Sequence, residues 1–179
     1  MPEWILISNK IMASGVLILQ FISLYIIFSL LIKKDPIGIS TLVGKYFKEV
    51  GITISLMSMA LSLFYSEVIG FPPCKLCVVQ RFLMYPQLLF FIIAKYNPKN
   101  IFIKIPVSLS VIGFFVSIFH YLVELGIFSS SLICGATGPS CAERYVFEFG
   151  YISIPMMAFA GFTFILLAFF ANKMFSPTK

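Results

Sequence analysis

Charged residues are scarce in this chain. Only 11% of its 179 residues are Asp, Glu, Lys or Arg, whereas about a quarter is usual in a soluble domain. Hydrophobic residues make up 60% of the chain, and the mean hydropathy is +1.01. This small number of charges cannot cover a water-exposed surface. The composition therefore excludes an ordinary soluble domain and predicts that most of the surface faces lipid.

Several signatures of other protein classes are also absent. The chain has no Gly-rich dinucleotide fingerprint, no C-x-x-C-H haem attachment site and no alternating ten-residue segments of a membrane barrel. The net charge of +6 comes from loop residues and not from a contiguous basic groove, which argues against a nucleic-acid partner.

Five apolar segments are long enough to cross a membrane, since about 20 apolar residues span about 30 Å of hydrocarbon. Backbone groups in lipid must be satisfied within the segment, so each is expected to be a helix. The first is too long for the apolar part of a signal peptide and lacks a clean cleavage site, so we expect it to be a retained span. The segments are 11–32, 50–66 with an extension past Glu67, 82–94 if the helix begins near Cys77, 105–123 and 149–172.

The basic residues predict the orientation. Nine of the thirteen lie in three segments, with four in 33–49, three in 95–104 and two in the tail 173–179. Positively charged loops stay in the cytoplasm, so the N-terminus is expected outside and the C-terminus in the cytoplasm. The other face carries five of the seven acidic residues.

That orientation places all four cysteines on the extracytoplasmic side, where disulfides persist. Cys74 and Cys77 precede the third span, and Cys134 and Cys141 precede the fifth. The pairs could be structural disulfides or a four-cysteine zinc site. A Cys74–Cys77 disulfide would close a very small ring and stabilise little, whereas a C-x-x-C pair at a helix N-terminus is a redox arrangement. We therefore expect redox chemistry and no metal site.

Arg81 lies inside the third span, where a charge costs roughly 2.5–3.5 kcal/mol at the centre and less near an end. It could snorkel to the headgroups, but it follows Cys77 by four residues and so shares a helix face with it. A cation there would stabilise a thiolate, or negative charge on an electron acceptor, and Gln80 beside it offers an amide. An acceptor that takes two electrons and dissolves in the bilayer is a quinone.

The motif C-x-L-C-x-x-Q-R, followed by "MYP", resembles the disulfide-bond formation protein B (DsbB) family of membrane oxidoreductases, especially its BdbC-type members. "SLFYSEV" at 62–68, "FHYLVE" at 119–124 and the second cysteine pair extend the resemblance over roughly residues 50–172. It implies a DsbB-like four-helix redox domain at 50–179. Residues 1–49 would then be an extra N-terminal span with a basic cytoplasmic loop.

The resemblance also implies a function in the bacterial cytoplasmic (inner) membrane. The family reoxidises a thioredoxin-like extracytoplasmic dithiol oxidase (DsbA/BdbD-like) and delivers the electrons to ubiquinone or menaquinone. By motif, Cys74 and Cys77 match the quinone-proximal pair, with Cys77 facing the quinone. Cys134 and Cys141 match the partner-facing pair, with Cys134 forming the mixed disulfide, and Arg81 matches the quinone-binding arginine. Gln80 stands where some members carry glutamate.

His120, the only histidine, lies near the outer end of the fourth span. It is either an interfacial residue reaching water or a hydrogen-bond donor and proton carrier for quinone reduction. Two alternatives to the whole interpretation stay open. One is a relay in another direction, like that of the vitamin K epoxide reductase-type proteins, which share a four-helix plan with a quinone and a C-x-x-C motif. The other is a non-catalytic membrane scaffold whose cysteines are structural.

Overall fold

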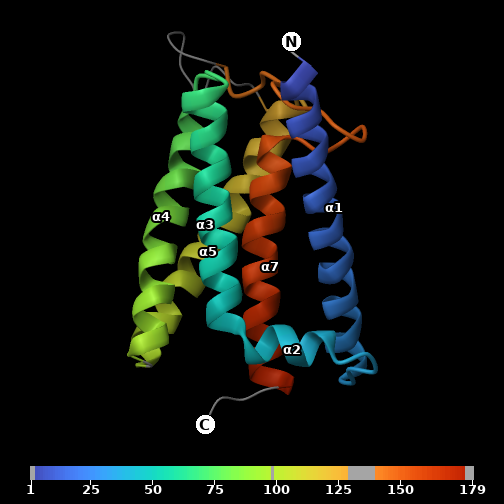
Figure 1. Ribbon diagram of the computed structural model, residues 1–179, viewed down its shortest axis with the longest axis vertical. Coiled ribbons are helices and arrows are strands. Elements are labelled where there is room, and N and C mark those ends of the chain that lie inside the picture. Colours follow the sequence, from blue (N-terminus) through green and yellow to red (C-terminus); the bar gives the residue numbers. More distant parts are fainter. Residues whose placement is uncertain (1–2, 98, 129–139, 176–179) are drawn as a thin grey trace.

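The computed structural model describes residues 3–97, 99–128 and 140–175, and every long element in these ranges is a helix. Five of the described helices are long and apolar enough to cross a membrane, which confirms the predicted five-span, all-α architecture. Figure 1 shows the bundle with the N-terminus at one end and the C-terminus at the other. The helices are α1 (Glu3–Ile32), α2 (Ile39–Lys45), α3 (Phe47–Leu63) continued by the π-helix η1 (Phe64–Val68), α4 (Lys75–Tyr96), α5 (Asn100–Glu124) and α7 (Ile154–Phe175).

The helices extend beyond the uncharged runs of the sequence. α1 begins at Glu3 and includes Lys10, since a long basic side chain near a helix end can reach the headgroups. The last span is shorter at its start than the expected 149–172. Phe149 and Gly150 have positive φ angles of 51° and 79°, which no helix tolerates, so α7 begins only at Ile154.

The core α3, α4, α5 and α7 pack closely where glycines meet aromatic rings. A side chain at Gly51 of α3 would collide with the ring of Phe91 on α4, and one at Gly113 of α5 would collide with Phe162 on α7. α1 packs mainly against α7 from outside this four-helix core. The short α2 crosses the end of the bundle opposite the N-terminus and joins α1 to α3 (Figure 1).

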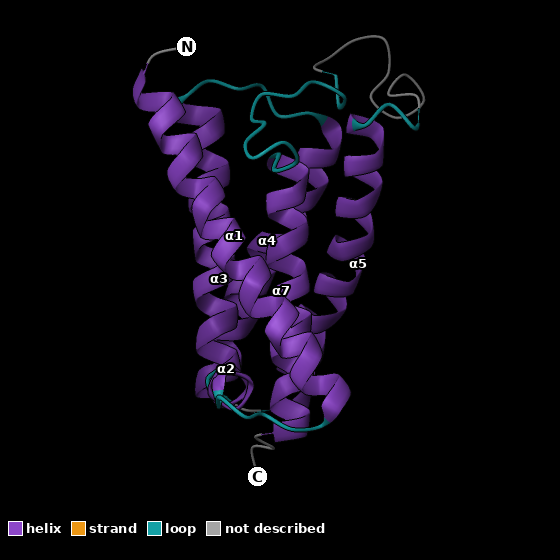
Figure 2. Ribbon diagram, turned by 90° about the vertical axis from the view of Figure 1, so that its right-hand side faces the viewer, coloured by secondary structure: helices purple, strands orange, loops and turns teal. Residues whose placement is uncertain are grey.

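The loops are divided between the two ends of the bundle. The segment before α4 with the first turn of that helix, and the segment before α7, together carry the described cysteines and lie at the same end as the N-terminus (Figures 1 and 2). The lysine-containing α2 and the connection between α4 and α5 lie at the opposite end. The described cysteines and most of the basic residues therefore occupy opposite ends, as the charge pattern predicts.

Candidate redox site

The C-x-x-C pair lies at the start of α4. Cys74 is the N-cap residue, with an extended backbone, and its sulfur accepts a hydrogen bond from the backbone N–H of Cys77 at 3.4 Å. Pro72 and Pro73 precede it and separate α4 from η1. The unpaired N–H groups and the positive end of the helix dipole stabilise a thiolate at this position.

Cys74 and Cys77 are both free thiols, with their sulfur atoms 3.2 Å apart. The pKa of Cys74 is lowered to about 4, and the largest cause is the hydrogen bond from the Cys77 thiol, although burial acts in the opposite direction. His120 contributes to this lowering, because its Nε2 lies 3.6 Å from the Cys74 sulfur. The reduced pair therefore holds a stabilised thiolate at Cys74, and stabilising the reduced form makes a cysteine pair a stronger oxidant.

Cys141 lies against this pair. It is 2% exposed and belongs to the same buried cluster as Cys74, Leu76 and Val123. Cys141 is disulfide-bonded, so it is not available as a thiolate for a four-cysteine metal site in this state. Cys134 falls outside the described residues. The structure thus brings three of the four predicted cysteines together at one end of the bundle.

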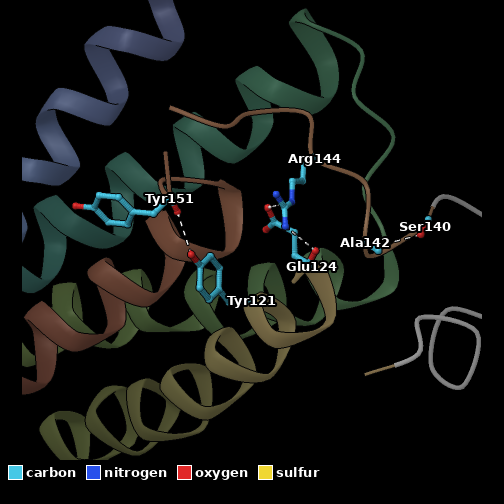
Figure 3. Close-up of polar contacts among 6 residues, drawn as sticks. All are labelled: Tyr121, Glu124, Ser140, Ala142, Arg144 and Tyr151. Carbon is cyan, nitrogen blue, oxygen red and sulfur yellow. Dashed lines mark hydrogen bonds and ion pairs between the residues drawn. The ribbon is translucent and has the colours of Figure 1, made fainter. Parts of the chain in front are cut away.

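The loop that carries Cys141 is fixed to the end of α5. Arg144 contacts the carboxylate of Glu124 at 3.5 Å and donates a hydrogen bond to the Glu124 carbonyl at 3.2 Å (Figure 3). The Tyr121 hydroxyl donates to the carbonyl of Tyr151 at 3.4 Å. Glu124 lies one turn after His120, so these contacts hold the loop next to the C-x-x-C pair. The sequence pattern alone did not identify the pairing of Arg144 with Glu124.

Arg81 is held by α3. Its Nε donates to the Ser62 hydroxyl at 2.7 Å, and its Nη2 donates to the Ser62 carbonyl at 3.0 Å. A guanidinium has five N–H donors, so these two bonds leave three without a protein partner among the described residues. Ser62 was not predicted as a site residue, although it begins the "SLFYSEV" segment that carries the family resemblance.

His120 and Gln80 are both buried. His120 is 2% exposed, so it is not an interfacial residue reaching water, and its Nδ1 has no hydrogen-bond partner among the described residues. The Gln80 amide donates to the Ser117 hydroxyl at 3.4 Å. Ser117 precedes His120 by three residues and lies on the same face of α5, which is the sequence signal that could have identified it.

A cavity of about 590 Å³ adjoins these residues, a size within the roughly 300–1,000 Å³ of sites for small organic ligands. Its lining is mostly apolar and comes from five of the long helices and from the loop around Cys141. The site residues that line it are Cys74, Cys77, Gln80, Arg81, His120 and Cys141. All the described candidate residues therefore border one cavity.

The donor set also fits a soft metal ion. The two sulfur atoms of the C-x-x-C pair and a ring nitrogen of His120 lie within 4.8 Å of one another, and sulfur and imidazole are zinc ligands. This set differs from the four-cysteine site considered from the sequence.

Comparison with known proteins shows which family this chain belongs to. The sequence profile described as "Disulfide bond formation protein DsbB" matches residues 47–172. This chain belongs to the DsbB family. A "Probable disulfide formation protein C 2" of Bacillus anthracis is 35% identical to this DsbB-family protein over 133 residues, covering 74% of this chain and 94% of the relative. "Disulfide bond formation protein C" of Bacillus subtilis (strain 168) is 36% identical over 114 residues, covering 64% and 83%. No solved structure was found to match. The DsbB-family match implies an oxidoreductase role in disulfide formation.

Proposed function

We propose that the protein reoxidises an extracytoplasmic thioredoxin-like dithiol oxidase and passes the electrons through its two cysteine pairs to a membrane quinone. The main support for this proposal is that Cys141, Cys74 and Cys77 lie close together at one end of the bundle. Cys141 packs in the same buried cluster as Cys74, and all three border the cavity that Arg81 also lines.

The first half of the relay is thiol–disulfide exchange. A partner thiolate attacks Cys134 of a Cys134–Cys141 disulfide, which releases the Cys141 thiolate and forms a mixed disulfide. Cys141 then attacks Cys74 of a Cys74–Cys77 disulfide, and Cys77 leaves as a thiolate. The partner's second thiol displaces Cys134, and Cys134 displaces Cys74 from Cys141. The partner is then a disulfide, Cys134–Cys141 is restored, and Cys74–Cys77 is a dithiol.

The residues bordering the cavity fit a quinone as the final acceptor. Arg81 has three uncommitted N–H donors, and His120 has a buried ring nitrogen without a partner among the described residues. Arg81 would stabilise negative charge on a quinone oxygen, and His120 would supply or relay a proton. The Cys74–Cys77 dithiol gives two electrons and two protons to the quinone, forming a quinol and restoring the disulfide.

The proposed orientation follows from charge. Loops rich in Lys stay in the cytoplasm, and the described cysteines lie at the opposite end of the bundle from most of the lysines. The cysteine loops would therefore face the extracytoplasmic side of a bacterial cytoplasmic membrane, where a thioredoxin-like partner could reach Cys134.

Steady-state turnover tests the proposal. Purified protein in detergent or nanodiscs would be mixed with reduced DsbA and a soluble quinone analogue, and thiol loss and quinone absorbance followed together. We expect one quinol for each partner disulfide, and loss of turnover in Cys134→Ser and Cys77→Ser. Partner oxidation at the wild-type rate in either variant, or without quinone in the absence of oxygen, would contradict the proposal.

A further inference from the structure

One wall of the cavity is formed by α1, which lies outside the residues that match the DsbB profile. The lining residues recur at intervals of three, four or one along the sequence, so they occupy one face of the helix. Only apolar side chains and one glycine contribute. They are Ile11, Met12, Gly15, Val16 and Leu19.

Two hydrogen bonds, one before and one after these lining residues along α1, hold α1 against the four-helix core. Before it, Asn9 is 2% exposed, and its side-chain oxygen accepts a hydrogen bond of 3.1 Å from the hydroxyl of Tyr65, itself a lining residue. After it, Gln20 accepts a hydrogen bond of 2.6 Å from the hydroxyl of Tyr151. Unpaired amides are costly in a membrane span, so these bonds favour one rotation and one depth for α1.

Tyr65 links this docking to the cysteine site. Its ring stacks on Phe71 at 6.1 Å between centroids, and Phe71 stacks on Tyr145 at 4.7 Å. Phe71 lies three residues before Cys74, and Tyr145 lies four residues after Cys141. α1 is thereby tied to both segments that carry the described cysteines.

The opposite wall comes from α3, through residues that include Ile54, Met57 and Leu61. α1 and α3 each pack against α7, and both line the cavity, so part of the cavity lies between these two helices. A side chain at Gly15 would meet no atom within 4 Å. Glycine within a helix costs about 1 kcal/mol relative to alanine, and no close contact with a helix among the described residues requires a glycine here. Gly15 therefore keeps a gap in the α1 wall.

We propose that α1 completes the quinone site by forming a subsite for the isoprenoid tail, and that the tail passes the gap at Gly15 between α1 and α3. This inference rests on the proposed quinone reduction. It assigns the headgroup to the polar end of the cavity, beside Cys77 and Arg81, and the tail to the apolar end, beside Gly15 and Met57. Methionine side chains adapt to a flexible apolar ligand, which suits Met12 and Met57.

The test compares Gly15→Phe with a matched control, Ile18→Phe. Ile18 is on the same helix, is 62% exposed and is not among the cavity-lining residues. Each reduced protein would be mixed without oxygen with either of two quinones that share a headgroup. One carries a single isoprenoid unit and the other a full-length tail. Single-turnover quinol formation is measured over a range of concentrations.

We expect Gly15→Phe to raise the half-saturating concentration of the long-tailed quinone about tenfold or more, because a few apolar carbons lose their burial. The short-tailed quinone should change less than about twofold in the same comparison. Gly15→Leu should give an intermediate effect, and Ile18→Phe should match wild type for both quinones. Thermal stability of each variant is measured alongside, so that loss of folding is recognised.

The two proposals fail in different ways. If wild-type protein reduces neither quinone, the proposed function is wrong. If wild-type protein reduces both, and stably folded Gly15→Phe and Gly15→Leu match it with the long-tailed quinone, only the tail subsite is wrong. An equal loss with both quinones would also contradict the tail subsite, since it would place Gly15 beside the headgroup.

Discussion

Replacing Arg81 with methionine tests what the charge in α4 does. The substitution keeps an unbranched apolar stem and removes the guanidinium, together with the 2.7 Å and 3.0 Å bonds to Ser62. If Arg81 binds the quinone oxygen, quinone reduction should weaken. If Arg81 only ties α4 to α3, the variant should be less stable but reduce bound quinone normally.

The size of the effect follows from the bonds available. Arg81 has three N–H groups without a protein partner among the described residues, and a charge-assisted hydrogen bond contributes roughly 1.5–3 kcal/mol. Since about 1.4 kcal/mol corresponds to a factor of ten, Arg81→Met should lower quinone affinity or the rate of quinone reduction by about one to two orders of magnitude. Arg81→Lys should restore part of the loss, because an ammonium lacks the planar fork.

The assay is a quinone titration at saturating reduced partner, with thermal unfolding measured in parallel. Ser62→Ala is the matched control, because it removes one support of Arg81 and leaves the charge in place. It should cost less than Arg81→Met. Exchange between the partner and Cys134 should be unaffected in all three variants. If Arg81→Met equals wild type in maximal rate and apparent quinone affinity, the arginine is structural and the quinone site lies elsewhere.

Three further predictions concern the cysteines. Cys141→Ser should accumulate a partner adduct through Cys134, visible on a non-reducing gel, because no resolving thiol remains beside Cys134; absence of the adduct would contradict the relay. All four thiols of reduced protein in intact cells should react with a membrane-impermeant maleimide, and labelling that needs cytoplasmic access would reverse the orientation. In reduced wild-type protein, alkylation of Cys74 should slow only as the pH falls through about 4. Cys77→Ala should raise the pKa of Cys74, because it removes the largest stabilising hydrogen bond, so alkylation of Cys74 should slow at a higher pH. Site-resolved mass spectrometry would follow the reaction, and unchanged pH dependence would show that Cys77 does not stabilise the thiolate.

Much of the architecture could be predicted from the sequence because lipid imposes simple rules. Uncharged runs identify the five spans, and the distribution of lysine identifies the ends of the bundle. The C-x-x-C motif with Arg81 four residues later identifies the redox end. Helix limits were less accurate, because Lys10 is tolerated within α1 and the positive φ angles at Phe149 and Gly150 delay α7.

The parts of the site that the sequence did not reveal depend on contacts between helices. Ser62 holds Arg81 across nineteen residues of sequence, and Arg144 meets Glu124 across twenty. No spacing rule relates such positions, because they come from different elements. The contribution of α1 to the cavity was equally hidden. Its uncharged run indicates a span, and only the packed structure shows that one of its faces lines the space beside the cysteines.

Anaerobic stopped-flow mixing of fully reduced protein with a quinone, without any partner, tests directly whether Cys74 and Cys77 deliver electrons to a quinone. We expect the dithiol of Cys74 and Cys77 to convert the quinone to quinol with loss of quinone absorbance, and we expect peptide mapping to find the Cys74–Cys77 disulfide afterwards. Cys77→Ser should form no quinol through this pair. If reduced wild-type protein leaves the quinone oxidised while Cys74 and Cys77 remain thiols, the claim that this pair delivers electrons to a quinone is wrong.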